Sequence, residues 1–230
     1  MSGDIISLCR RRLAREKGTI RKDRGGRLPV ALVYPGFYRM GMSNLGFQLV
    51  YHLLNRRPDV AAERVFLPEG QEMSLYLQTG KPLLSLETQT PLRNFHLVAF
   101  SLSFENDYLN LLKILEMGNI PLLREARTGP DPYVMAGGVT TFLNPEPLAD
   151  FMDFFLLGEA EANLDPFIDA FIDLSCRRSK RKDVIRDLAV QVPSLYAPGL
   201  YRAGYHGDGT LAAFRPVDAG LPETIRPARL

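Results

Sequence analysis

The stretch Val33–Gly46, which reads VYPGFYRMGMSNLG, decides the fold that the sequence predicts. Its first residues end an apolar segment, 28–34, that is typical of a buried β-strand. A loop rich in glycine, methionine and aromatic residues follows, and then an amphipathic helix over 43–57 with Ser43 or Asn44 as its cap. In an open α/β sheet the loop after the first strand usually contacts the ligand, so we expect a ligand loop here.

Further apolar segments alternate with helical patterns along the chain. The expected strands cover 63–67, 97–103, 133–136 and 154–157, and the expected helices cover 69–78, 106–117 and 162–174. This alternation predicts an α/β fold with a flavodoxin-like (Rossmann-like) five-stranded parallel sheet, in the order 2-1-3-4-5, and helices on both faces. A helix over 183–190 and a β-hairpin over 201–214 are expected to form a C-terminal extension.

We expect the chain to have four parts. A basic arm (1–27) precedes the α/β domain (28–176), a helix-and-hairpin extension follows (177–217), and a Pro- and Arg-rich linker comes last (218–230). The arm carries nine Lys/Arg against three Asp/Glu, so with a formal charge of +2 overall the other residues sum to −4. The arm and the run Arg177–Lys182 offer an electrostatic contact for RNA, and the alternative is a solvated helix face and a charged linker.

Composition places the chain among globular proteins of the cytoplasm. Its 230 residues are 46% hydrophobic, and no apolar stretch is long enough to span a membrane. The N-terminus lacks the apolar region of a secretory signal. The two cysteines, Cys9 and Cys176, lie far apart, which disfavours a disulfide framework and a cysteine-ligated metal or iron–sulfur site.

The unusual residues fall in the loops after strands 1, 3, 4 and 5, which are expected to share one edge of the sheet. The candidate binding residues are Tyr38, Arg39, Met40, Gly41, Met42, Ser43, Asn44, Ser101, Ser103, Glu105, Gly137, Gly138, Asn144, Glu146, Gly158 and Glu159. The thioethers of Met40 and Met42 suit a large flat or apolar ligand, and Arg39 suits a phosphate. The glycines allow a ligand to approach the backbone closely. The alternatives are tight turns, satisfied strand hydroxyls and helix caps.

No group of residues in the sequence is typical of catalysis. The three histidines, His52, His96 and His206, fall in a helix, at the start of a strand and in a hairpin turn. Glu159 and Glu161 lie near a helix start but have no acid/base partner. The residues by themselves therefore predict a chain that binds a ligand and is non-catalytic.

Several long stretches together resemble one known family. They include YPGFYRMGMSNLGFQLVYHLLNRRPDV (34–60), PLLSLETQTPL (82–92), FSLSFENDYLNLLKILEMGNIPL (100–122), AGGVTTFLNPEPLADFMDFFLLGEAE (136–161) and VPSLYAPGLY (192–201). They resemble the N-terminal domain of a family of uncharacterised radical SAM proteins, in which a domain similar to cobalamin-binding domains precedes the radical SAM barrel. The resemblance covers about residues 28–217 and implies the flavodoxin-like fold.

The resemblance also implies cobalamin as a cofactor, with its nucleotide tail along the sheet near strands 1, 3 and 4. Ser101-Leu102-Ser103 and Gly137-Gly138 occupy the places of the SxL and GG elements of cobalamin domains. The DxHxxG loop that supplies an axial histidine is replaced by Tyr38–Met42, so the resemblance implies a corrinoid without a histidine ligand from this loop. The CxxxCxxC motif is absent, so the [4Fe-4S] cluster and S-adenosylmethionine are expected in a catalytic barrel outside this sequence, and the chain is expected to be a fragment or a split gene product.

Two functions follow as expectations. The first is an accessory domain of a radical SAM protein that binds a corrinoid or a substrate segment at the carboxyl edge of the sheet. The alternative is a cofactor-free interaction module that docks a radical SAM barrel or RNA.

Overall fold

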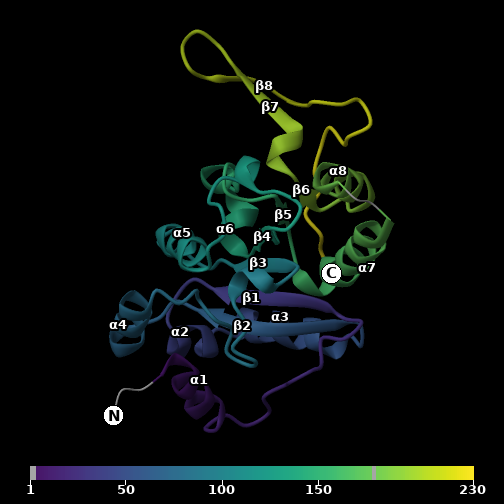
Figure 1. Cartoon of the computed structure of the whole chain (residues 1–230). Helices are drawn as coiled ribbons and strands as arrows, with labels where there is room; N and C mark the ends of the chain where they lie inside the picture. The colour runs from purple at the N-terminus through teal and green to yellow at the C-terminus, as the bar shows by residue number, and fades with distance from the viewer. Residues whose placement is uncertain (1–3, 178–179) are drawn as a thin grey trace. The chain divides into compact units, whose positions relative to one another are not determined.

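The computed structural model describes residues 4–177 and 180–230, and it has the expected α/β class. Its strands form a mostly parallel six-stranded sheet in the order β2-β1-β3-β4-β5-β6, and a separate two-stranded sheet contains β7 and β8 (Figure 1). The order of the first five strands is confirmed, and the sixth strand is an addition to it. The chain divides into two compact units, which are described separately. Unit 1 contains the described residues up to 122 together with 130–133, and unit 2 contains the other described residues.

Unit 1 contains the first three strands of the sheet and the first five helices. Its strands are β1 (Leu28–Tyr34), β2 (Val60–Phe66) and β3 (Leu97–Ser101). Its helices are α1 (Ile5–Leu13), α2 (Tyr38–Ser43), α3 (Leu45–Arg56), α4 (Gly70–Thr79), α5 (Asp107–Met117) and the 3-10 turn η1 (Leu92–Asn94). Strand β1 pairs in parallel with β2 and with β3. Both partners therefore end at the same edge as β1.

The loop that the sequence predicts after β1 contains a short helix, α2. The backbone N–H groups of Met40 and Gly41 donate to the carbonyl of Phe37. No proline or β-branched residue interrupts 38–43, so a helical turn forms between the end of β1 and the start of α3. The expectation of an irregular loop is wrong for these residues.

Helix α3 begins where the sequence predicts and is fastened to the sheet by aromatic rings. The side-chain oxygen of Asn44 accepts a hydrogen bond from the backbone N–H of Phe47 at 2.9 Å, which caps the helix. The Phe47 ring is fully buried and lies 5.4 Å from the Phe66 ring of β2 and 5.6 Å from the Tyr34 ring of β1, measured between centroids. Because both strands contact this one ring, α3 has a fixed position over the face that they share.

The N-terminal arm contributes to the core of unit 1. Helix α1 buries Ile5, Cys9 and Leu13, which recur every four residues and so form one apolar stripe. Arg12, on the same helix, pairs with Glu72 of α4 at 3.0 Å. The helix ends at Leu13, and an irregular segment leads from it to β1.

The outer strand of unit 1, β2, is covered by the segment that follows α4. The backbone N–H of Leu86 donates to the carbonyl of Arg64 at 2.8 Å. The backbone N–H of Arg64 in turn donates to the carboxylate of Glu87 at 2.7 Å. Strand β2 is an edge strand, so these two bonds occupy groups that would otherwise be unpaired.

Unit 2 contains the rest of the sheet, two long helices and the hairpin. Its strands are β4 (Tyr133–Gly137, the first residue of which belongs to unit 1), β5 (Phe154–Leu156), β6 (Leu195–Tyr196), β7 (Tyr201–Tyr205) and β8 (Leu211–Pro216). Its helices are α6 (Val139–Leu143), α7 (Ala160–Arg177) and α8 (Arg181–Gln191), with 3-10 turns η2 (Arg124–Ala126), η3 (Glu146–Leu148) and η4 (Pro198–Leu200). Strand β5 pairs in parallel with β4 and antiparallel with β6. The expected hairpin is confirmed, and α7 is longer than expected at both ends.

The last residues of the chain pair with the residues that directly follow β5, although the sequence shows no core pattern there. Ala228 forms a parallel bridge with Gly158, and its N–H donates to the carbonyl of Leu157 at 3.0 Å. Gly158 has φ of 102°, a conformation that favours glycine, and a Cβ there would meet the backbone of Ala228. Glycine at this position therefore lets the C-terminal segment lie against β5.

No helix among the described residues is long and apolar enough to cross a membrane.

Candidate functional site

In unit 1 the ends of β1 and β3 bring two of the predicted binding segments together. We call residues 35–45 and 102–106 the β1–β3 edge. The side-chain amide of Asn44 donates to the hydroxyl of Ser103 at 3.0 Å. Asn110 of α5 donates to the carbonyl of Pro35 at 3.0 Å, so a second bond joins the segment after β1 to the helix that follows β3. The predicted candidates Asn44 and Ser103 are thus in direct contact.

The β1–β3 edge exposes several large apolar side chains. Leu45 is 82% exposed and Phe104 is 60% exposed, and each follows directly after one partner of the Asn44–Ser103 hydrogen bond. Phe37 and Met40 are exposed on the same edge. Exposed apolar groups that gather in one place mark an interaction surface more often than singly scattered ones do.

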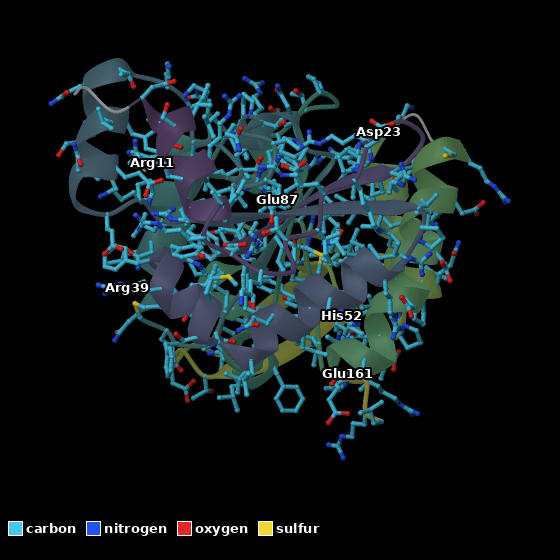
Figure 2. All side chains as sticks on the ribbon, turned by 90° about the horizontal axis from the view of Figure 1, so that it is seen from below. Arg11, Asp23, Arg39, His52, Glu87 and Glu161 are labelled. Carbon is cyan, nitrogen blue, oxygen red and sulfur yellow. The ribbon has the colours of Figure 1, made fainter. Side chains whose placement is uncertain are left out.

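The polar candidates at this edge have few partners of their own. Arg39 is exposed and lies at the margin of the view in Figure 2. Buried Glu87, in contrast, is surrounded by other side chains in that view. The hydroxyl of Ser43 donates to the carbonyl of Arg39 at 2.8 Å within α2. Ser101 is half-buried at the end of β3, and Glu105 is exposed before α5. These four residues remain predicted binding residues.

Two other candidates have structural partners. Gly41 is buried, and a Cβ there would lie 2.5 Å from the Phe66 ring and 3.1 Å from the Tyr34 ring. Glycine at this position therefore makes room for packing. Tyr38 donates its hydroxyl to Glu16 at 2.6 Å and stacks edge-on against Phe66. Burial and then the hydrogen bond to Glu16 raise the pKa of Tyr38 to about 12.

The candidates in unit 2 lie at the ends of β4 and β5. Gly137 ends β4, and Gly138, with φ of 115°, begins the turn into α6. Asn144 accepts from the backbone N–H of Glu146 at 3.2 Å, and Glu146 accepts a 2.5 Å hydrogen bond from the Tyr196 hydroxyl.

The two candidates after β5 contact the C-terminal segment. Gly158 lies against Ala228, and the Glu159 carboxylate accepts from the backbone N–H of Leu230 at 2.6 Å. Each therefore has a partner within unit 2, and their proposed contact with a ligand remains a prediction.

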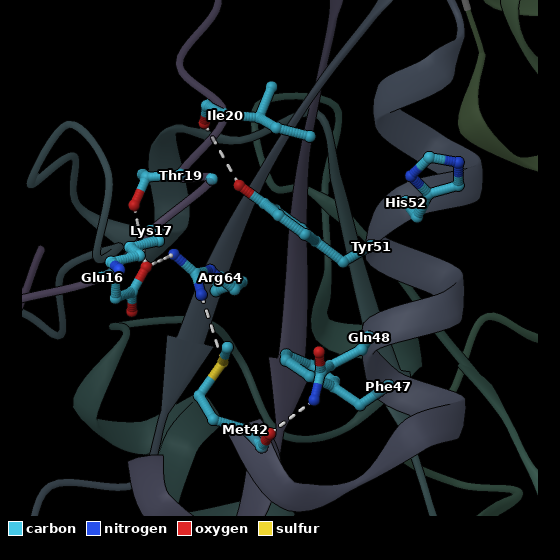
Figure 3. A pocket seen from close by; sticks show the side chains of 11 residues that line it. Glu16, Lys17, Thr19, Ile20, Met42, Phe47, Gln48, Tyr51, His52 and Arg64 are labelled. Carbon is cyan, nitrogen blue, oxygen red and sulfur yellow. Dashed lines mark hydrogen bonds and ion pairs between the residues drawn. The ribbon is translucent and has the colours of Figure 1, made fainter.

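A second feature of unit 1, which the sequence does not predict, is a pocket of about 400 Å³ (Figure 3). We call it the Arg64 pocket. Residues 16–20 form one wall, α3 forms another, and Arg64 of β2 and Met42 of α2 complete it. Helix α3 presents Gln48, Tyr51 and His52 to it, three and four residues apart and hence on one face.

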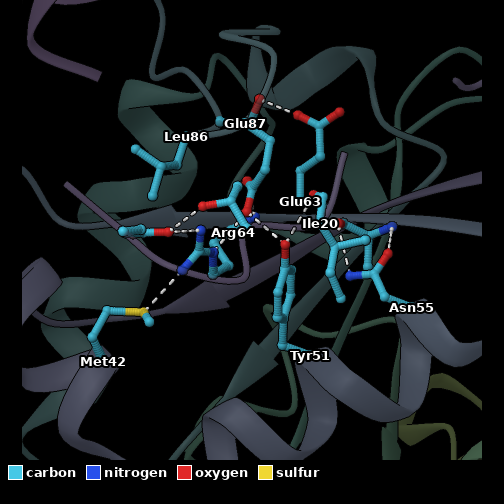
Figure 4. Close-up of polar contacts among 12 residues, drawn as sticks. Ile20, Met42, Tyr51, Asn55, Glu63, Arg64, Leu86 and Glu87 are labelled. Carbon is cyan, nitrogen blue, oxygen red and sulfur yellow. Dashed lines mark hydrogen bonds and ion pairs between the residues drawn. The ribbon is translucent and has the colours of Figure 1, made fainter. Parts of the chain in front are cut away.

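Arg64 lies between two carboxylates at the base of this pocket, and its side chain is 2% exposed. Its Nε atom donates to Glu87 at 2.6 Å (Figure 4), and its Nη2 atom donates to Glu16 at 2.7 Å (Figure 3). Its Nη1 atom faces the sulfur of Met42 at 3.1 Å. The guanidinium also lies over the Tyr51 ring, 4.8 Å from the centroid.

The carboxylates of this cluster have opposite pKa shifts. Burial raises the pKa of Glu87, whose side chain is wholly enclosed, in spite of its bonds from Arg64. Burial also opposes ionisation of Glu16, but hydrogen bonds from Arg64 and Tyr38 outweigh it and lower the pKa of Glu16. Burial likewise disfavours the charge of Arg64, but Glu87 and Glu16 outweigh it and raise the pKa of Arg64. Arg64 therefore stays charged.

The sequence holds one signal for this cluster. The expected strand near 63–67 contains Glu63-Arg64 in the midst of apolar residues, and charged residues are almost never fully buried unless they are paired. Glu63 has a network of its own, in which Arg24, Ser85 and Thr88 donate to its carboxylate. The partners of Arg64 are separated from it by 48 and 23 residues, so spacing does not point to them.

Several arginines of the basic segments that suggest RNA binding are paired with carboxylates within the protein. Arg12 pairs with Glu72, and Arg24 pairs with Glu63. In unit 2 Arg181 pairs with buried Asp153 at 2.6 Å, and Arg177 pairs with Asp173. Residues 178–179 of the basic run lie outside the described residues. Charges held by carboxylates contribute little to a phosphate-binding surface, so the structure gives the RNA hypothesis no support.

The described residues contain no cluster of three or more His, Cys, Asp or Glu side chains that is arranged to hold a metal ion. Cys9 is buried in α1 and Cys176 is exposed on α7, and both are free thiols.

Comparison with known proteins gives two matches. Residues 46–198 match a family described as "Radical SAM proteins, N-terminal". An uncharacterised protein of Methanocaldococcus jannaschii is 28% identical to this chain over 134 residues. The aligned part is 58% of this chain and 24% of that relative, so the chain spans about a quarter of the relative's length. No solved structure matches.

Proposed function

Because the chain belongs to the N-terminal domain family of radical SAM proteins, we propose that it is an accessory domain that binds a radical SAM catalytic domain through the β1–β3 edge. In this proposal the chain contributes no catalytic residue. The [4Fe-4S] cluster and S-adenosylmethionine belong to the catalytic domain. The protein works in the cytoplasm, in keeping with its two free thiols.

One observation carries the proposal: the β1–β3 edge exposes apolar side chains whose backbone is held by hydrogen bonds. Asn44 caps α3 and is hydrogen-bonded to Ser103. Leu45 and Phe104 are the next residues in the chain, so this hydrogen bond fixes the backbone beside both exposed side chains. Removing two such side chains from water on docking stabilises a complex by about 1.5–3 kcal/mol each before the entropic costs of association. A surface of this kind suits an apolar face of a protein partner or a substrate segment.

The first experiment reads the gene beyond codon 230. If a CxxxCxxC motif is encoded there, it identifies the catalytic domain. The whole protein and this chain alone are then produced as two samples and compared. We expect amide hydrogen exchange at residues 37–45 and 102–106 to slow by at least tenfold in the whole protein. Equal exchange at the edge in the two samples would overturn the proposal.

Paired substitutions test the same edge. Leu45→Lys with Phe104→Lys is expected to remove the protection, because two charges would be buried in an apolar contact. Leu77→Lys on α4 is the matched control, since Leu77 is 75% exposed and does not belong to the edge. Loss of protection in the control as well would show that the effect is not specific to the edge.

A corrinoid is a second proposed occupant of the β1–β3 edge. The exposed thioether of Met40 and the exposed rings of Phe37 and Phe104 suit one face of a large flat ligand. The segment offers no axial imidazole, and the sulfur of Met42 already faces Arg64. The residues present therefore fit a corrinoid that is held by apolar contact and not one that is ligated through this helix.

Titration with hydroxocobalamin tests this second occupant. We expect a change in the visible spectrum on binding and retention of the colour on a desalting column. If neither is seen, the corrinoid proposal fails. That result would leave the docking proposal standing, because the exchange experiment needs no cofactor.

A further inference from the structure

The Arg64 pocket contains a buried donor that the protein does not fully satisfy. A guanidinium has five N–H groups. In Arg64 one donates to Glu87, one to Glu16 and one to the thioether sulfur of Met42, which is a weak acceptor. Among the residues that the structure describes, the other two N–H groups have no acceptor, although the side chain is 2% exposed. A buried donor in this position calls for an acceptor in the adjoining pocket.

The charges around Arg64 decide what kind of acceptor fits. Glu16 and Glu87 already contact the same guanidinium, so an anion would bring a third negative group to one cation. A cationic ligand would compete with Arg64 for Glu16, whose carboxylate also accepts from Tyr38 and Thr19. An uncharged acceptor, such as a ring carbonyl, avoids both conflicts.

The walls of the pocket decide the shape of the ligand. Ile20, Met42, Phe47 and the ring of Tyr51 supply apolar and aromatic surface, and Tyr51 is held in place because its hydroxyl donates to the carbonyl of Ile20 at 3.1 Å. The volume, about 400 Å³, lies in the range of small-molecule sites. The apolar part of the lining, with the Arg64 donor at the base, suits a flat ring that carries its acceptor on the edge. The rest of the lining is polar, with Lys17, Thr19, Gln48 and His52.

We propose that the Arg64 pocket binds a small, uncharged heteroaromatic molecule of about nucleobase size, whose ring carbonyl accepts a hydrogen bond from Arg64 in place of the Met42 sulfur. Gln48 and His52, both exposed on α3, lie at the mouth of the pocket, where they can contact polar groups on the far side of the ring. This site lies on the face of β2 under α3 and shares Met42 with the segment 35–45, but its test needs no catalytic domain docked at the β1–β3 edge.

Calorimetric titration with uracil and orotate tests the charge preference. The two probes share one ring with ring carbonyls, and orotate adds a carboxylate. We expect uracil to bind with a dissociation constant of about 1 mM, which is typical of so small a ligand, and orotate to bind at least tenfold more weakly. Orotate binding as tightly as uracil would overturn the choice of a neutral ligand. No binding of either probe at about 10 mM would overturn the site.

Three variants locate the bound uracil. Gln48→Trp fills the mouth of the pocket and is expected to abolish binding, whereas Gln78→Trp, an exposed glutamine on α4, is the matched control and is expected to bind normally. Met42→Leu keeps the apolar wall but removes the competing sulfur, so we expect binding about threefold tighter. Binding that survives in Gln48→Trp, or that weakens tenfold in Met42→Leu, contradicts the proposed position.

Discussion

Arg64 links three segments of unit 1 that are distant in sequence. Its contacts join the segment after α1, strand β2 and the segment after α4 through the carboxylates of Glu16 and Glu87. A buried ion pair contributes little by itself, because desolvation of both charges offsets their attraction. Removal of one partner is costly, however, because the other charge is then left buried without compensation.

We therefore expect Arg64→Met to lower the free energy of unfolding by about 3–5 kcal/mol. The double variant Arg64→Met, Glu87→Leu should recover at least about 1 kcal/mol of that loss, since it removes the enclosed Glu87 carboxylate, while Glu16 keeps Tyr38 and Thr19 as donors. Urea unfolding of the wild type, both single variants and the double variant gives the coupling. Strict additivity would show that the two side chains do not compensate each other.

Arg177→Met provides the comparison for an exposed pair. Its partner Asp173 and Arg177 itself are 44% and 73% exposed. We expect a change below about 1 kcal/mol, because solvent screens surface ion pairs.

Tyr38 should make stability fall with pH in the alkaline range. Its pKa rises from 10.0 to about 12 on folding, so the folded state holds the phenol proton more tightly than the unfolded state. The contribution is complete below pH 10 and is lost as the pH rises through about 12. Tyr38→Phe should flatten that part of the curve of unfolding free energy against pH.

The comparison for Tyr38 is Tyr205→Phe, a change at an exposed residue of the hairpin. It should change the free energy of unfolding by less than about 0.5 kcal/mol, as substitutions at exposed residues usually do. A Tyr38→Phe curve that runs parallel to the wild type between pH 10 and 12 would show that Tyr38 does not hold its proton on folding.

At the level of helices and strands, Asn44 has two structural roles at the start of α3. Its side-chain oxygen caps α3, and its side-chain amide reaches Ser103. Asn44→Ala should therefore destabilise the protein by about 1–2 kcal/mol, whereas Asn44→Asp keeps the cap and should cost less than about 1 kcal/mol. Thermal unfolding measures both variants.

Ser103→Ala separates the two roles of Asn44. It removes only the hydrogen bond to Asn44, which Asn44→Ala removes as well, so these two changes combined should cost no more than Asn44→Ala alone. Independent, additive losses would mean that the bond between the two loops does not form.

The sequence predicts most elements of this fold because their signals are local. Apolar periodicity marks β1 and β3, Asn44 marks the start of α3, and Gly80, with φ of 62°, ends α4. By contrast β6 has two residues, too few for any periodic pattern, and α2 depends on the elements at either end of it.

The same distinction between local and tertiary signals applies to the two candidate sites. The sequence predicts the β1–β3 edge, because strand ends can be read from local pattern, and the Asn44–Ser103 contact lies there. It does not predict the Arg64 pocket, because Glu16, Tyr51 and Glu87 are brought to Arg64 only by the tertiary fold.

At the scale of the whole molecule, the arm can be tested as part of unit 1 through the thiol of Cys9. Cys9 is 3% exposed on α1, and burial raises its pKa to about 11, whereas Cys176 is exposed. With Ellman's reagent at pH 8 we expect Cys176 to react at once and Cys9 to react at least 100-fold more slowly.

Release of α1 should remove the protection of Cys9. Leu13→Asp, made in a Cys176→Ser background, places a charge in the buried stripe and should make Cys9 reactive in the folded protein. Equal reaction of both thiols in the wild type would show that α1 is not packed in solution.

The covering of β2 bears on how copies of this protein behave at high concentration. An open edge strand offers a row of free amides and carbonyls on which a strand of another molecule can add, and this is a common start of aggregation. Here the N–H of Arg64 donates to Glu87 and its carbonyl accepts from Leu86. Loss of the Glu87 carboxylate should therefore do more than weaken unit 1. It should also leave the N–H of Arg64 on edge strand β2 free to pair with another molecule. A Glu87→Leu variant that still folds should therefore form fibrils or precipitate under conditions in which the wild type does not.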